Sequence, residues 1–240
     1  MKWKPVTLSC AAIFALSPTL YLYAASQSAD AGLSVDITNP RGGDVLRWGT
    51  QSGYSVTVAY DGKSTKYGEI PANYVLMRAS YAANLDAARA RRKDALPDAL
   101  IDITRSNCTG CHDFSASAAG PSFSAIARRY AGKAAAASKL VSHIKNGSSG
   151  IWSEGVMPPH PDLSEAQATA IAKWIVGHGN DPAIHYYVGP DGGFRMEAPT
   201  DPGPKAGMVL RAFYTGPLND GDMRVAAGND VVVVRGSPGP

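Results

Sequence analysis

The chain has 240 residues, with 23 lysines and arginines against 20 aspartates and glutamates. Residues 1–25 are predicted to be a cleaved signal peptide, because Lys2 and Lys4 precede an apolar run that ends in small residues. Its removal lowers the formal charge from +3 to +1, so no overall basic field favours nucleic acid as a partner. An uncleaved membrane anchor is the alternative, since the run approaches spanning length.

Residues 33–80 are predicted to be a small β module. The segments "SVDIT" and "YSVTVAY" alternate in polarity, as half-buried strands do, and Asp61 and Gly62 supply a turn. Residues 81–97 are rich in alanine and arginine and indicate a helical linker that ends at Pro97. The basic residues in this linker fit a solvated helix better than a docking patch.

Residues 98–179 are predicted to be an all-α domain. Helices are expected around "DALIDITRSNC", "SFSAIARRYAG", "ASKLVSHIKNG" and "LSEAQATAIAKWIVGHG". The second and third of these end at glycine, a common helix stop. The last has the clearest start, because Ser164 and Gln167 have the spacing of a capping box. A domain this small gains from a bound cofactor on which its helices can pack.

Residues 183–240 return to β character in "FRMEAP", "MVLRAFYT" and "VVVVR". The predicted fold is therefore multidomain, with an all-α unit flanked by two small all-β segments. The sequence leaves open whether these two segments form separate modules or share one core.

The segment "SNCTGCHDF" places Cys108 and Cys111 three residues apart, with His112 directly after them. A redox dithiol would give His112 no role, a zinc site would need a second Cys or His pair, and a disulfide at this spacing would constrain little. Covalent attachment of haem c accounts for all three residues. The two thiols would form thioethers to the haem vinyl groups, and His112 would be the proximal iron ligand. We therefore predict one haem c per chain, attached outside the cytoplasm.

Met157 is the predicted second axial ligand. It lies between two predicted helices and is followed by Pro158 and Pro159. Because each proline fixes its own φ and restrains the residue before it, this loop can hold a thioether sulfur against iron with little loss of entropy. His160 is the competing ligand in the same loop.

Two further residues are expected to support the cofactor. The carbonyl of Pro121, in "AAGPSF", would accept a hydrogen bond from the ring of His112 and fix its plane. Trp152 would donate its indole N–H to a haem propionate, or it would pack as a wedge under the loop. Trp174 is expected to be a core residue of the last helix.

The segments "CTGCH", "AGPSF" and "IWSEGVMPPHPDLSEAQATAIAKWI" resemble small bacterial class I monohaem cytochrome c domains over about 85 residues. The "MPPHP" loop looks like the versions fused to periplasmic sugar dehydrogenases that use pyrroloquinoline quinone (PQQ). The β segments resemble, more weakly, the PKD- or immunoglobulin-like (Ig-like) modules of those fusions. The chain departs from the family at Ala99, where many relatives have glycine for close helix contact. The site residues implied by the resemblance are Cys108, Cys111, His112, Met157 and Pro121.

This resemblance implies periplasmic electron transfer through a His/Met-ligated haem c. We expect an electron carrier and not an enzyme, with a dehydrogenase or an oxidase as redox partner. The chain leaves no room for the six-bladed propeller that oxidises sugars. Two other functions stay open: a haem subunit of a sugar dehydrogenase or peroxidase complex, and a β protein that binds carbohydrate or a partner and carries a cytochrome domain.

Overall fold

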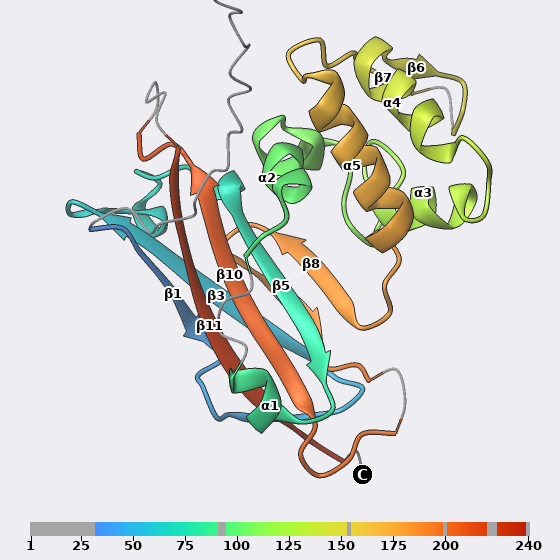
Figure 1. Cartoon of the computed structure of the whole chain (residues 1–240). Coiled ribbons are helices and arrows are strands. Elements are labelled where there is room, and N and C mark those ends of the chain that lie inside the picture. The colour runs from blue at the N-terminus through green and yellow to red at the C-terminus, as the bar shows by residue number, and fades with distance from the viewer. Residues whose placement is uncertain (1–31, 91–94, 153–154, 199–200, 220–224, 239–240) are drawn as a thin grey trace, which may run out of the picture.

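The computed structural model describes residues 32–90, 95–152, 155–198, 201–219 and 225–238. A helical unit is inserted into a β sandwich, between strands β5 (Val75–Ala82) and β8 (Ile184–Val188) (Figure 1). The predicted leader lies outside the described residues. No helix in the described ranges has the length and apolar character needed to cross a membrane.

Both sheets of the sandwich combine strands from before and after the helical unit. One sheet contains β1 (Ser34–Asn39), β3 (Gln51–Tyr60), β4 (Lys63–Ser64) and β9 (Asp191–Arg195). The other has the order β2 (Val45–Arg47), β11 (Ala226–Ser237), β10 (Gly207–Gly216), β5 and β8. All neighbours are antiparallel except β2 and β11, which are parallel.

The sequence left open whether the β segments at 33–80 and 183–240 share one core, and this topology shows that they do. Strand β9 pairs with β3, and β5 lies between β10 and β8. One buried cluster also joins residues of both segments, such as Val56 and Met77 with Phe194 and Leu210. Polarity alternation shows which face of a strand is buried but not which distant strand it pairs with, so the sequence could not settle this point.

Burial along the strands follows from what covers each face. In β3, Tyr54, Val56 and Val58 are buried in alternation, as in a strand with one face toward solvent. The first residues of β5 are buried without interruption, since one face lies in the sandwich and the other under the helical unit. The turn predicted at Asp61 and Gly62 is confirmed, with both residues at positive φ between β3 and β4.

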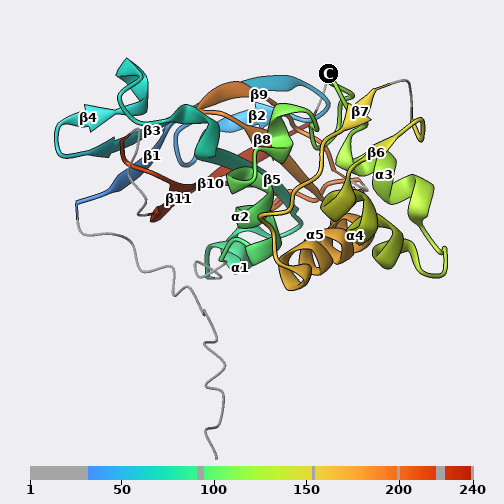
Figure 2. The same cartoon turned by 90° about the horizontal axis from the view of Figure 1, so that it is seen from above.

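The helical unit follows α1 (Leu85–Ala90), which lies within the predicted linker. It contains α2 (Asp98–Arg105), α3 (Phe123–Tyr130), α4 (Ala136–Asn146), α5 (Glu165–His178) and a short ladder of β6 (Ser148–Ser149) and β7 (Val156–Met157). Because of this ladder the unit is mainly, and not wholly, α-helical. The capping box at the start of α5 is confirmed: the hydroxyl of Ser164 accepts from the N–H of Gln167 at 3.2 Å. Figure 2 shows α2, α3, α4 and α5 gathered on one side of the sandwich.

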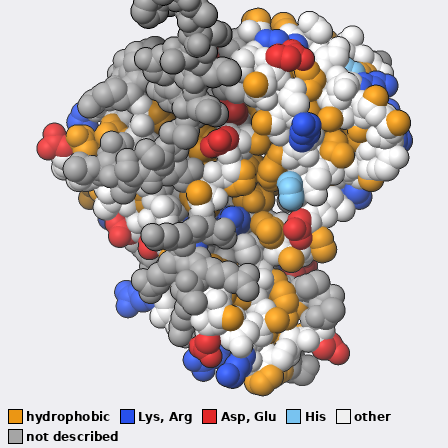
Figure 3. All heavy atoms as spheres, viewed as in Figure 1, with side chains coloured by type: hydrophobic (Ala, Val, Ile, Leu, Met, Phe, Trp, Pro, Cys, Tyr) orange, Lys and Arg blue, Asp and Glu red, His pale blue; other side chains and the backbone are white. Residues whose placement is uncertain are grey.

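An aromatic contact joins the two units. The ring of Phe114 lies 5.1 Å from that of Tyr186 in β8, and Trp174 of α5 lies 5.7 Å from the same tyrosine. Leu76 of β5 and Phe213 of β10 also belong to the buried cluster of the helical unit. Hydrophobic side chains are visible along this boundary in the space-filling view (Figure 3). The helical unit is thus packed directly on the sheet that contains β5, β8 and β10.

Candidate functional site

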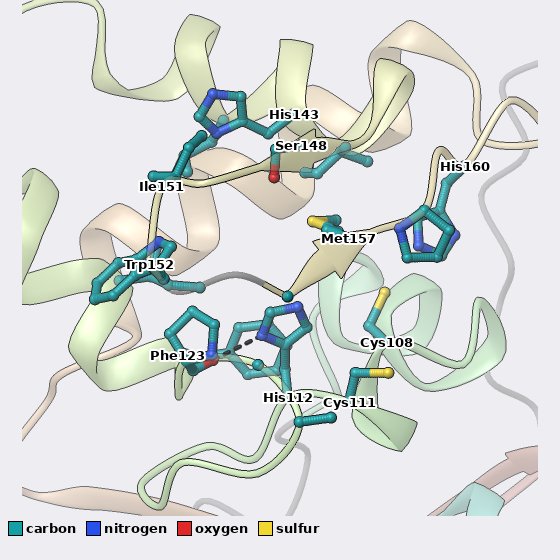
Figure 4. A pocket seen from close by; sticks show the side chains of 18 of the residues that line it. Cys108, Cys111, His112, Phe123, His143, Ser148, Ile151, Trp152, Met157 and His160 are labelled. Carbon is teal, nitrogen blue, oxygen red and sulfur yellow. Dashed lines mark hydrogen bonds between the residues drawn. The ribbon is translucent and has the colours of Figure 1, made fainter.

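The Cys-x-x-Cys-His segment forms a tight turn directly after α2. Asn107 adopts a left-handed conformation with φ of 55°, and a 3₁₀ turn covers Cys108–Gly110. The N–H groups of Cys111 and His112 both donate to the carbonyl of Cys108, at 3.2 and 2.9 Å. These bonds bring both thiols and the imidazole to the lining of one cavity (Figure 4).

The two cysteines are not joined in a disulfide. Cys108 is half-buried and Cys111 is exposed. Burial raises the pKa of the Cys108 thiol to about 11, so its neutral form suits an apolar wall. The described residues contain no group of three or more His, Cys, Asp or Glu side chains arranged to hold a metal ion by themselves.

The ring of His112 is held from two sides. Its Nδ1 lies 2.7 Å from the carbonyl oxygen of Pro121, and because a carbonyl only accepts, Nδ1 must carry the proton. This leaves Nε2 with a free lone pair, the form that binds metal ions. The ring of Phe123 stacks on the imidazole at a centroid distance of 5.5 Å.

The cavity has a volume of about 230 Å³ and lies between α3, α4, α5 and the loop before α5. Most of its lining is hydrophobic, including Phe123, Ile126, Leu140, Ile144, Ile171 and Ile175. An imidazole nitrogen, a thioether sulfur and two thiols all reach this apolar space. The donors and the lining therefore fit a c-type haem, which needs two thiols at one edge and axial ligands on its two faces.

Met157 enters the cavity from β7, where it pairs with Ser148 of β6. Gly147, with φ of 75°, allows a close approach at this point: a Cβ there would lie 2.7 Å from the carbonyl oxygen of Met157. His160, the competing ligand, also lines the cavity, and its backbone N–H donates to the carbonyl of Ile144 at 2.9 Å.

Trp152 lines the rim of the cavity and is 39% exposed, so it is not a fully buried wedge. The guanidinium of Arg129 lies 4.5 Å from the centre of its ring and donates to the carbonyl of Ile151 at 3.0 Å. Arg129 was not predicted from the sequence, because nothing in the spacing of α3 and the loop connects these residues.

Sequence reasoning also missed Gly120 and Lys145. A Cβ on Gly120 would lie 2.7 Å from Cε1 of His112, so glycine is required beside the imidazole. The ammonium of Lys145 donates to the carbonyls of Pro161 and Leu163 in the loop that follows Met157. For Gly120, the one signal in the sequence was its position directly before Pro121, the predicted partner of His112.

Comparisons with known proteins agree with this geometry. Residues 95–175 match the family model described as cytochrome C oxidase, cbb3-type, subunit III. Cytochrome c-552 of Nitrosomonas europaea is 43% identical over 72 residues, which cover 30% of this chain and 70% of the relative. Cytochrome c-551 of Azotobacter vinelandii is 44% identical over 71 residues, which cover 30% of this chain and 85% of the relative.

The crystal structure of wild-type Nitrosomonas europaea cytochrome c552 is 42% identical in sequence. The alignment covers 31% of this chain and 91% of that chain, with a TM-score of 0.30. The two cytochrome relatives, which are 43% and 44% identical and are covered over 70% and 85% of their length, show that the chain belongs to the class I monohaem c-type cytochromes, which transfer electrons through a covalently bound haem c.

Proposed function

We propose that this protein is a periplasmic electron carrier in which Cys108 and Cys111 hold one haem c, with His112 and Met157 as axial ligands. One observation supports this assignment above all others. The carbonyl of Pro121 engages Nδ1 of His112 at 2.7 Å, which leaves Nε2 free in a cavity that the side chain of Met157 also lines (Figure 4). A histidine whose second nitrogen is bonded to a carbonyl is the usual form of a metal-binding imidazole.

When bound, the haem supplies an iron that exchanges one electron between its ferrous and ferric states. The protein adjusts the energy of this exchange. The thioether of Met157 raises the reduction potential, and the apolar lining around Ile144 and Ile175 disfavours the more positively charged ferric state. The bond from His112 to Pro121 acts in the opposite direction, because it makes the imidazole more basic.

We further propose that Trp152 donates its indole N–H to a haem propionate. Its ring lies at the rim of the cavity, and Arg129 holds the adjacent backbone through the carbonyl of Ile151. The cationic guanidinium on the ring would also attract the negative charge of a propionate.

The expected partner is a dehydrogenase that donates electrons or an oxidase that accepts them. The match to a cbb3-type oxidase subunit family supports an oxidase as one candidate. The narrower likeness to PQQ-dependent sugar dehydrogenase fusions with PKD/Ig-like modules, and carbohydrate as a ligand of the β domain, stay predictions. The same holds for export through the leader and for membrane attachment if that leader is retained.

Replacement of Met157 tests the ligand assignment. Met157→Ala should abolish the weak far-red sulfur-to-iron charge-transfer band of the ferric protein and lower its reduction potential. The matched control is Met77→Leu, a nearly volume-conserving change in the buried core of the β sandwich, which should leave both readouts unchanged. A far-red band that survives Met157→Ala would exclude Met157 as the ligand. Ready binding of carbon monoxide or cyanide by the unaltered protein would favour an open-iron peroxidase.

A further inference from the structure

We propose that Lys145 is a positioning residue for the axial methionine, because its ammonium fastens the loop that carries Met157 to the end of α4. This inference rests on the ligand assignment proposed above. It concerns a lysine that lies outside the Cys-x-x-Cys-His motif and outside the lining of the cavity.

The loop from Met157 to Leu163 has few backbone N–H groups with which to anchor itself. Three of its seven residues are prolines, namely Pro158, Pro159 and Pro161, and these have no N–H to donate. The loop still has carbonyl oxygens that require donors. Lys145 supplies them: its Nζ donates to the carbonyl of Pro161 at 3.1 Å and to that of Leu163.

These contacts belong to a set that ties the loop to the last turn of α4. The carbonyl of Ile144 accepts from the N–H of His160 at 2.9 Å, which also satisfies a carbonyl that the helix end leaves without an internal partner. Ser148, just beyond the helix, pairs with Met157. The backbone therefore anchors the start and middle of the loop, and the side chain of Lys145 anchors its far end.

The charge on Lys145 makes this anchor stronger than a neutral donor would be. Hydrogen bonds from charged groups are roughly twice as strong as those between neutral groups. Lys145 is half-buried, so water competes only partly for its ammonium. Without these bonds the loop gains freedom, and the sulfur of Met157 would leave the iron more readily and yield its place to an external ligand.

A purely structural role would have a different signature. If Lys145 only stabilised the helical unit, its removal would lower the midpoint of unfolding. It would not change how well an external ligand competes with the Met157 sulfur for the iron. Binding of imidazole to the ferric holoprotein measures that competition directly, at a temperature well below the unfolding transition.

The experiment compares Lys145→Met, Lys145→Arg and the control Lys173→Met with the unaltered holoprotein. Lys173 is exposed on α5, so its replacement removes the same charge from a neighbouring helix without touching the loop. Lys145→Met should bind imidazole about tenfold more tightly, which corresponds to about 1.4 kcal/mol. Its far-red band should also be weaker. Lys145→Arg, which keeps the charge and the donors, and Lys173→Met should both remain within about twofold of the unaltered protein, which is about 0.4 kcal/mol.

The possible failures are distinguishable. If the unaltered protein has a far-red band that depends on Met157, but Lys145→Met and Lys173→Met bind imidazole equally, the role of Lys145 is overturned and the ligand assignment stands. A fall in the unfolding midpoint of Lys145→Met with unchanged imidazole affinity likewise overturns positioning. If no band depends on Met157, the ligand assignment fails, and this inference fails with it.

Discussion

Gly120→Ala should disturb the proximal histidine directly. A Cβ at position 120 would lie 2.7 Å from Cε1 and 2.9 Å from Nδ1 of His112, whereas ordinary contact begins at 3.4 Å. The imidazole would therefore have to move by about 0.7 Å. The backbone of Gly120 cannot easily move instead, because its N–H donates to the carbonyl of Cys111 at 2.8 Å and its carbonyl accepts from Ala118 at 3.1 Å.

The size of the effect follows from what the imidazole would lose. Its bond to Pro121 is 2.7 Å long, so a shift of this size weakens or breaks it. Loss of one hydrogen bond lowers the free energy of unfolding by about 0.5–1.5 kcal/mol, and overpacking lowers it by about 1–3 kcal/mol. We expect Gly120→Ala to destabilise the holoprotein by roughly 2–3 kcal/mol. The reduction potential should rise, because a less basic imidazole stabilises the ferric state less.

The assay is guanidinium unfolding followed by the visible absorption of the haem, together with a redox titration. Gly177→Ala is the control, since a Cβ at this helical position meets nothing within 4 Å. Replacing a helical glycine with alanine should stabilise the protein by about 0.5–1 kcal/mol. The same substitution thus has opposite effects at the two sites. Equal stability and potential for Gly120→Ala and the unaltered protein would refute the packing described around His112.

Three further predictions concern stability. Phe114→Ala, at the contact with Tyr186, should lower the free energy of unfolding by about 3–5 kcal/mol, and the helical unit should then unfold at a lower denaturant concentration than the β sandwich. A single, unchanged transition in both haem absorption and circular dichroism would contradict this. Ser164→Ala should lower the free energy of unfolding by about 0.5–2 kcal/mol, because the cap of α5 is lost; unchanged unfolding in urea would count against the cap. The pKa of Asp102 is raised because burial outweighs the hydrogen bond from Gln167, which lowers it. The ionised carboxylate therefore lowers the free energy of unfolding at neutral pH. Asp102→Asn should therefore raise the melting temperature at pH 7. That gain should shrink as the pH falls through the raised folded pKa, and should vanish below the ordinary value of about 3.9; a gain independent of pH would refute this cause.

The local chemistry of the candidate site could be predicted because each part of it is encoded in a short segment. The spacing of Cys108, Cys111 and His112 fixes their common turn, and the prolines after Met157 mark a stiff loop. The start of α5 was equally readable, since a capping box needs only Ser164 and the residue three positions later. In each case the relevant contacts join residues that are close in the sequence.

The contacts that could not be predicted join distant segments. Lys145 and Pro161 lie 16 positions apart in the sequence, and no pattern between them indicates their hydrogen bond. Likewise, Phe114 and Tyr186 lie on different units, and nothing in the sequence relates them. Such contacts depend on how the helices pack, which periodicity does not specify.

Strand positions near glycines were also difficult to predict. The predicted strand began at Phe194, but β9 extends back to Asp191 and includes Gly192 and Gly193. The ring of Tyr54 on the paired strand β3 covers Gly192, where a Cβ would lie 2.7 Å from that ring. These glycines serve a close approach between strands and not a turn, a distinction that depends on the partner strand.

Mass spectrometry of the intact protein tests covalent haem attachment most directly. The protein is produced with its leader in cells that carry the periplasmic machinery for haem attachment. The expected result is a mass increased by one haem, located on the peptide that contains Cys108 and Cys111, and a colour that stays with the protein in acidified acetone. The double variant Cys108→Ala/Cys111→Ala should lack the added mass. A mature chain without added mass, or a pigment that the acidified acetone removes, would contradict the proposed attachment at this turn.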